Sequence, residues 1–82
     1  MKIEQPPEES ALEIVIKPEQ CRMARAALRW GIERLAKEAD LAENTVVAFE
    51  AGRSVRNLSI CQIQDTLEKA GVRFTSNAVE IP

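Results

Sequence analysis

Two short segments with helical periodicity, separated by a break of three residues, constrain the fold more than any other feature of the sequence. The first covers residues 32–39, the break covers residues 40–42, and the second covers residues 43–51. Helices joined by so few residues must cross steeply, which brings their inner faces into close contact. The small or apolar side chains expected at this crossing are Ile32, Leu35, Ala36, Ala39, Leu41, Val46 and Phe49, with Thr45 beside them. The second helix is then held with its outer face away from the core, and Gly52 is predicted to end it as a left-handed cap.

Further helices are predicted on both sides of this pair. Residues 19–30 favour a helix by composition, and Pro18 suits its first turn. Gly31 is expected to separate this helix from the next. The apolar stripe of this first helix is Cys21, Ala24 and Leu28, widened by Ala27. Residues 58–70 form the last predicted helix, which ends at Gly71, with a core stripe of Ile60, Ile63, Leu67 and Ala70.

Strands are predicted at both ends of the helical part. Residues 11–17 alternate apolar side chains with charged or mixed ones, and residues 72–74 and 78–81 alternate around a turn. The three strands pair either within one chain or across the two-fold axis of a dimer, and the sequence leaves both arrangements open. Residues 1–10 are acidic and proline-containing, which predicts a flexible lead-in to a single domain over residues 11–82, with its helical part at residues 18–70.

The composition argues against catalysis. The chain has 82 residues, two cysteines and no histidine, which excludes the usual nucleophile–base pairs and the common zinc sites. We therefore expect no enzyme activity, catalytic residue, cofactor, metal ion or small-molecule ligand. Cys21 and Cys61 are predicted to be small core thiols without a disulfide, as in a reducing cytoplasm. No signal-peptide pattern and no bilayer-length apolar run is visible, so a cytoplasmic protein without a membrane partner is expected.

The charge distribution permits contact with nucleic acid without requiring it. The net charge is −2, but residues 18–60 contain seven basic and six acidic residues, and six of the seven bases are arginine. Arg22, Arg25 and Arg29 form a basic stripe on the first helix, and three alternatives stay open for it: it is solvated, it flanks DNA, or it pairs with Glu19, Glu33 or the acidic N-terminal residues. Trp30 is expected to pack on the core rather than to stack on a base.

These elements resemble the lambda-repressor/Cro-like helix-turn-helix regulators, the XRE family, over about residues 18–70. The resemblance is carried by Leu35-Ala36 in the second helix, by Phe49-Glu50 and Gly52 at the end of the third, and by Ala70-Gly71-Val72-Arg73-Phe74 after the fourth. It implies a mainly α fold, a four-helix lambda-repressor-like helix-turn-helix domain with short N- and C-terminal β-strands. Glu50 would then be a structural residue on the solvent side of the third helix.

The resemblance also implies a function, sequence-specific binding of double-stranded DNA by a transcriptional regulator that is a homodimer. The third helix would enter the major groove. Base contacts would come from its first exposed positions, which are Glu43, Asn44, Val47 and Ala48. Phosphate contacts would come from Arg34, Thr45, Arg53, Ser54 and Arg56.

Several positions depart from the family pattern and support a second hypothesis. Gly31 and Ile32 stand where the family has a capping Ser or Thr and a Gln that touches the DNA backbone, and Ile32 has no donor for a phosphate. Asp40 stands at the position where the family has a glycine in the turn. The third helix has no Lys or Arg and contains two acids. The alternative is therefore a protein-interaction module with a helix-turn-helix fold that has lost DNA binding.

Overall fold

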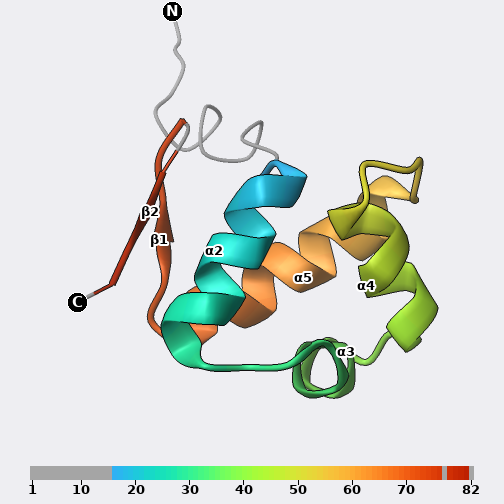
Figure 1. The fold of residues 1–82 in the computed structure, drawn as a ribbon, viewed down its shortest axis with the longest axis horizontal. Coiled ribbons are helices and arrows are strands. Elements are labelled where there is room, and N and C mark those ends of the chain that lie inside the picture. The colour runs from blue at the N-terminus through green and yellow to red at the C-terminus, as the bar shows by residue number, and fades with distance from the viewer. Residues whose placement is uncertain (1–15, 77, 82) are drawn as a thin grey trace, which may run out of the picture.

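The computed structural model describes residues 16–76 and 78–81, which form four helices followed by a small antiparallel sheet. The helices are α2 (Pro18–Leu28), α3 (Ile32–Ala39), α4 (Glu43–Glu50) and α5 (Asn57–Lys69). Strands β1 (Arg73–Phe74) and β2 (Val79–Glu80) pair with Phe74 opposite Val79 and Arg73 opposite Glu80. The protein is thus mainly helical, and the hairpin lies beside α2 at one side of the molecule (Figure 1).

The core lies where the inner faces of the four helices meet. Cys21 and Ala24 of α2, Leu35 and Ala36 of α3, and the middle of the α5 stripe are buried, as the apolar stripes predict. The core cluster is completed by Ile16, Val46, Phe49, Ile63, Leu67 and Val72. Four stripe residues differ from expectation. Ala27 is exposed, so the α2 stripe is narrower than predicted, and Leu28, Ile60 and Ala70 are only partly buried.

The first helix ends earlier than its composition predicts. α2 stops at Leu28 because Arg29 adopts a left-handed conformation, with φ of 61°, and its amide donates to the carbonyl of Ala26. Trp30, predicted to be helical, therefore lies in the connection and packs partly buried against the core. The break predicted at Gly31 falls at Arg29 instead, whereas Gly31 opens the next helix as predicted. It is the extended residue that precedes α3. The ends of α4 and α5 differ from prediction by one residue, within the fraying expected of helix termini.

The tight connection between α3 and α4 is confirmed. Asp40 is left-handed, with φ of 60°, a conformation that Asp tolerates better than most residues other than glycine. The amide of Leu41 donates to the carbonyl of Ala36 at 2.9 Å, and the Leu41 side chain packs on the core. Figure 1 views α3 down its axis while α4 runs across the view, so the two helices cross steeply. Gly52 follows α4 with φ of 83°, the predicted left-handed cap.

The predicted strand over residues 11–17 is not borne out where the structure describes it. Residues 11–15 lie outside the described part, and Ile16 and Lys17 are not in a strand. The amide of Ile16 donates to the Gln64 side chain and the amide of Lys17 to the Gln20 side chain. These two amides are therefore bonded to glutamine side chains and not to the backbone of a neighbouring strand. Within the described residues, the sheet consists of the hairpin alone.

Gln20 joins the start of α2 to the hairpin. Its side chain is 1% exposed, and its Nε2 donates to the carbonyl oxygens of Thr75 at 2.7 Å and Ala78 at 3.2 Å. Its Oε1 accepts from the amide of Lys17 at 2.8 Å. One buried amide group therefore satisfies three backbone groups from two segments far apart in the sequence.

We expect Gln20→Ala to lower the free energy of unfolding by about 2 kcal/mol, because it leaves backbone groups without partners in a buried place. Urea unfolding followed by circular dichroism measures the change. Glu19→Ala, at the exposed neighbouring position, is the control and should change stability by less than about 0.5 kcal/mol. Equal effects of the two substitutions would contradict this role of Gln20.

Candidate nucleic-acid interface

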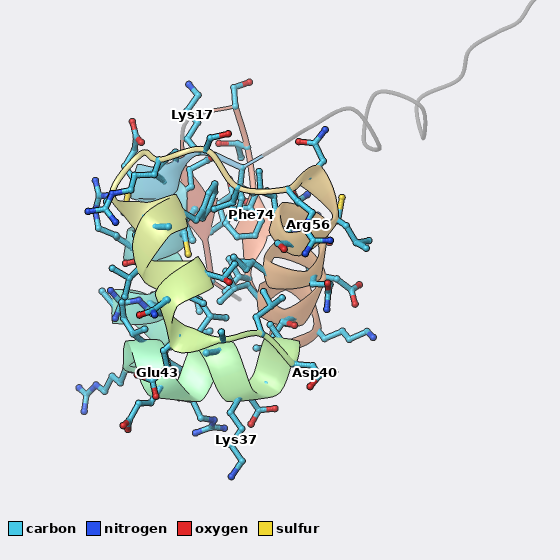
Figure 2. All side chains as sticks on the ribbon, turned by 90° about the vertical axis from the view of Figure 1, so that its right-hand side faces the viewer. Lys17, Lys37, Asp40, Glu43, Arg56 and Phe74 are labelled. Atoms are coloured by element: carbon cyan, nitrogen blue, oxygen red, sulfur yellow. The ribbon has the colours of Figure 1, made fainter. Side chains whose placement is uncertain are left out.

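The outer face of α4 is the surface on which the predicted base-contacting residues meet. Glu43 and Asn44 are exposed in the first turn, Val47 is 42% exposed one turn later, and Ala48 is half-buried. The structure therefore places all four on the same short helix, with Ala48 at the edge of the exposed face. Figure 2 looks onto α4 and shows Glu43 projecting from its beginning into solvent.

The opposite side of α4 is anchored in the core. Val46 is fully buried and Phe49 is 4% exposed, and both belong to the core cluster. Since the two anchors lie three residues apart on one face, they fix the rotation of α4 about its axis. This rotation directs Glu43, Asn44 and Val47 outward. Thr45, assigned to phosphate contact, is half-buried on the flank of the helix.

A buried ion pair holds the last turn of α4. Glu50 is 7% exposed, and its two carboxylate oxygens each accept a hydrogen bond from Arg25, Oε2 from Nε and Oε1 from Nη2, both at 2.8 Å. The remaining Nη1 of Arg25 donates to the carbonyl of Trp30 at 3.1 Å. Arg22 donates to the backbone carbonyl of Glu50. Two arginines of α2 thus hold the carboxyl-terminal end of α4. Arg25 does so through a bidentate pair with the carboxylate, and Arg22 through the backbone carbonyl.

This contact corrects two expectations from the sequence. Glu50 is buried rather than on the solvent side, and Arg25 pairs with it rather than with Glu19, Glu33 or solvent. The spacing of Arg22 and Arg25 on α2 was visible in the sequence. Their partner Glu50 was not visible in the sequence, because no local pattern shows that α2 and the end of α4, which are separated by α3, lie in contact.

Cys21 lies beneath the ion pair and contributes to it. Its Sγ donates to Oε2 of Glu50 at 3.1 Å, and the thiol is fully buried. Burial, together with the neighbouring carboxylate, raises the pKa of Cys21 well above its ordinary value, so the thiol stays neutral. Both cysteines are free, as predicted, but Cys61 is exposed on α5 rather than in the core.

Apart from Thr45 on α4, the residues assigned to phosphate contact fall into two groups. Arg53, Ser54 and Arg56 are all exposed in the loop between α4 and α5, and Figure 2 labels Arg56 at the end of this loop. Arg34 is elsewhere, on the outer side of α3. Its Nε pairs with Glu38 at 3.0 Å, and its guanidinium lies 4.6 Å from the centre of the Trp30 ring. A contact from Arg34 to a phosphate would therefore compete with two neighbours within the chain.

The start of α3 confirms the departure noted in the sequence. Gly31 precedes the helix without a side chain to cap it, and Ile32 is half-buried against the core. Ile32 thus contributes packing where a glutamine would offer a donor. At α4, Glu43 lies in the first turn, where a carboxylate is favoured by the helix dipole.

Comparisons with known proteins add no relative. No protein-family model matches the chain, and no curated protein matches it. Among residues 16–76 and 78–81, no helix combines the length and apolar character that crossing a membrane requires. The same residues hold no cluster of three or more His, Cys, Asp or Glu side chains suited to a metal ion.

Removing the Glu50 carboxylate should be costly. We expect Glu50→Ala to lower the free energy of unfolding by about 3 kcal/mol, because it leaves Arg25 partly buried without its partner. Glu38→Ala removes the exposed pair with Arg34 and should cost less than about 1 kcal/mol. Urea unfolding of both variants tests the difference, and similar losses would show that the Glu50 pair is no stronger than a surface pair.

The same carboxylate should make stability depend on pH. Burial raises the pKa of Glu50, but hydrogen bonds from Arg25 and Cys21 outweigh burial, so the pKa lies below its ordinary value. The folded state therefore binds this proton less readily than the unfolded state, and the stabilisation is complete above about pH 4.3 and lost as the pH falls below it. Urea unfolding between pH 7 and pH 3 should show a steeper acid loss for the unaltered protein than for Glu50→Gln. If the stability of both proteins fell equally with pH, the Glu50 carboxylate would not be the source of the pH dependence.

Proposed function

We propose that this protein is a DNA-binding transcriptional regulator with a lambda-repressor-like helix-turn-helix, formed by α3 and α4. The observation that carries the proposal is the presentation of α4. Its inner side is fixed by Val46, Phe49 and the Glu50 ion pair. Its outer side exposes two polar side chains, Glu43 and Asn44, and the apolar side chain of Val47. A rigid, outward-facing helix of this kind fits the major groove of B-DNA.

The exposed side chains of α4 suit base edges. The Asn44 amide is able to form two hydrogen bonds with adenine, at N6 and N7. The Glu43 carboxylate is an acceptor for the N4 amino group of cytosine, and repels phosphates where no such donor faces it. Val47, with Ala48 beside it, offers apolar contact to a thymine methyl group. The proposed site is therefore one of direct base readout with few charges.

The loop after α4 supplies the proposed phosphate contacts. Arg53, Ser54 and Arg56 are exposed and follow α4 directly, so they flank the groove that α4 would enter. Thr45 adds a hydroxyl from the flank of α4. Arg34 is proposed as a weaker contact, since Glu38 and Trp30 already hold it. With so few cations available, we expect one domain to bind modestly and a homodimer on an inverted repeat to bind more tightly.

A second candidate function is a protein-interaction module of the same fold. Three observations favour it: the lack of Lys and Arg in α4, the packing of Ile32 where a phosphate donor is needed, and the hydrogen bonds that Arg22 and Arg25 make to Glu50 within the chain. In this case the exposed face of α4 would meet another protein rather than a duplex.

DNA binding at several salt concentrations separates the two functions. We expect the logarithm of the association constant to fall linearly with the logarithm of salt concentration, on random duplexes and on duplexes selected for tight binding. Asn44→Ala should relax sequence preference at about one position, by about tenfold, and Arg53→Ala should weaken binding to all duplexes and lower the salt slope by about one.

Ser76→Ala, at an exposed position in the hairpin turn, is the matched control and should change neither quantity. A folded protein that binds no duplex at low salt would overturn the regulator and favour the interaction module. If Asn44→Ala weakened binding to selected and to random duplexes by the same factor, base readout by α4 would be overturned.

A further inference from the structure

The side of α5 that faces away from the core combines a prominent apolar side chain with a groove. Leu58, in the first turn of α5, is 68% exposed, the highest value among the exposed large hydrophobic residues of the described part. Further along the same helix, a groove of about 430 Å³ opens between α5 and the end of α3. Ala39 and Ala70 are among the residues that line it, with Trp30, Gln62, Glu38 and Asp65.

Leu58 and the groove lie on one side of the helix. Residues four and seven or eight positions after Leu58 are Gln62, Asp65 and Thr66, and all three line the groove. Because positions at this spacing share a helix face, the apolar projection and the hollow run along one line on α5. A surface that carries both a projection and a matching hollow is self-complementary, as a two-fold interface requires.

We propose that two copies of this chain pack α5 against α5 in antiparallel fashion, about a two-fold axis near Gln62, so that Leu58 of each copy enters the groove of the other. Leu58 and Thr66 are equally far from Gln62 along the helix, about 6 Å at 1.5 Å per residue. In an antiparallel pair, residue 58 of one copy therefore lies opposite residue 66 of its partner, which lines the groove. The small side chains of Ala39 and Ala70 leave space there for a leucine.

The charges around the groove fit this occupant. Glu38 already pairs with Arg34, and Asp65 with Lys69 at 3.1 Å, so covering the groove leaves neither carboxylate without a partner. The end of α5 that would enter has no acidic residue in its first turn, and Arg56 directly precedes it. The amino-terminal end of a helix is positive, so it is attracted to the two carboxylates of the partner.

This arrangement extends the proposed function, which calls for a dimer, but it concerns a different surface. Of the two strand arrangements that the sequence leaves open, the described strands show pairing within one chain, β1 with β2, so the proposed dimer does not use them. Since the dimer forms without DNA, its test does not depend on whether α4 binds a duplex.

Sedimentation velocity of the full chain without DNA, over a range of micromolar concentrations, measures the dimer dissociation constant. We expect a dimer, and a rise in that constant of about 30-fold or more in Leu58→Asp, as for a central interface residue. Met23→Asp is the matched control, because Met23 is also an exposed apolar residue, 41% exposed, but lies on α2. It should leave the constant unchanged. Both substitutions are at exposed positions, and thermal unfolding verifies that both variants fold.

A native cysteine gives a second readout. Cys61 is exposed and next to Gln62, whereas Cys21 is buried, so a bifunctional maleimide should join two copies through Cys61. Crosslinking should be lost in Cys61→Ser and in Leu58→Asp and kept in Met23→Asp. A monomeric unaltered protein would overturn the proposal, as would a dimer that Leu58→Asp leaves intact. A chain that dimerises only after residues 1–15 are removed would also overturn it, since its own N-terminal residues would then occupy the groove.

Discussion

The bidentate ion pair between Arg25 and Glu50 is the contact on which the rest of the arrangement depends. It joins α2 to the last turn of α4, two helices that are separated in the chain by α3. Val46 and Phe49 fix the rotation of α4 about its axis, and the planar guanidinium of Arg25 adds a directional contact at its carboxyl-terminal end. The outer face of α4, which is proposed to read DNA, is therefore positioned by Arg25 and Glu50, which lie away from that face and are largely buried. Two arginines of α2 make this contact, Arg25 with the carboxylate and Arg22 with the backbone carbonyl of Glu50.

The helices were predictable because their signals are local. The apolar spacing of Leu35, Ala36 and Ala39, the short break at Asp40 and the cap at Gly52 are each set by neighbouring residues. The end of α2 was misplaced because Arg29 adopts a left-handed conformation that no local signal demands. The partner of Arg25, by contrast, depends on tertiary packing, so the pattern on α2 indicated a basic stripe without showing what it binds.

The candidate site was predictable in part for the same reason. The outward positions of Glu43, Asn44 and Val47 follow from the inward positions of Val46 and Phe49 once α4 is known to be a helix. The engagement of Arg34 by Trp30 and Glu38 does not follow, because Trp30 lies in a connection whose path the periodicity does not describe. The groove beside α5 is a property of two helices together, and no single segment indicates it.

Gln20 has a consequence for how the chain reaches its final state. Its two carbonyl partners lie 55 and 58 residues away in the sequence, and the amide of Ile16 meets Gln64 at a separation of 48. During synthesis the helices emerge first, yet the polar group at the base of α2 finds its acceptors only when the hairpin residues have left the ribosome. Contacts between such distant residues also tend to slow folding. Until then, Nε2 of Gln20 lacks both of its acceptors and only Oε1 is bonded, to the nearby amide of Lys17, so the last residues of the chain complete the hydrogen bonding at the start of α2.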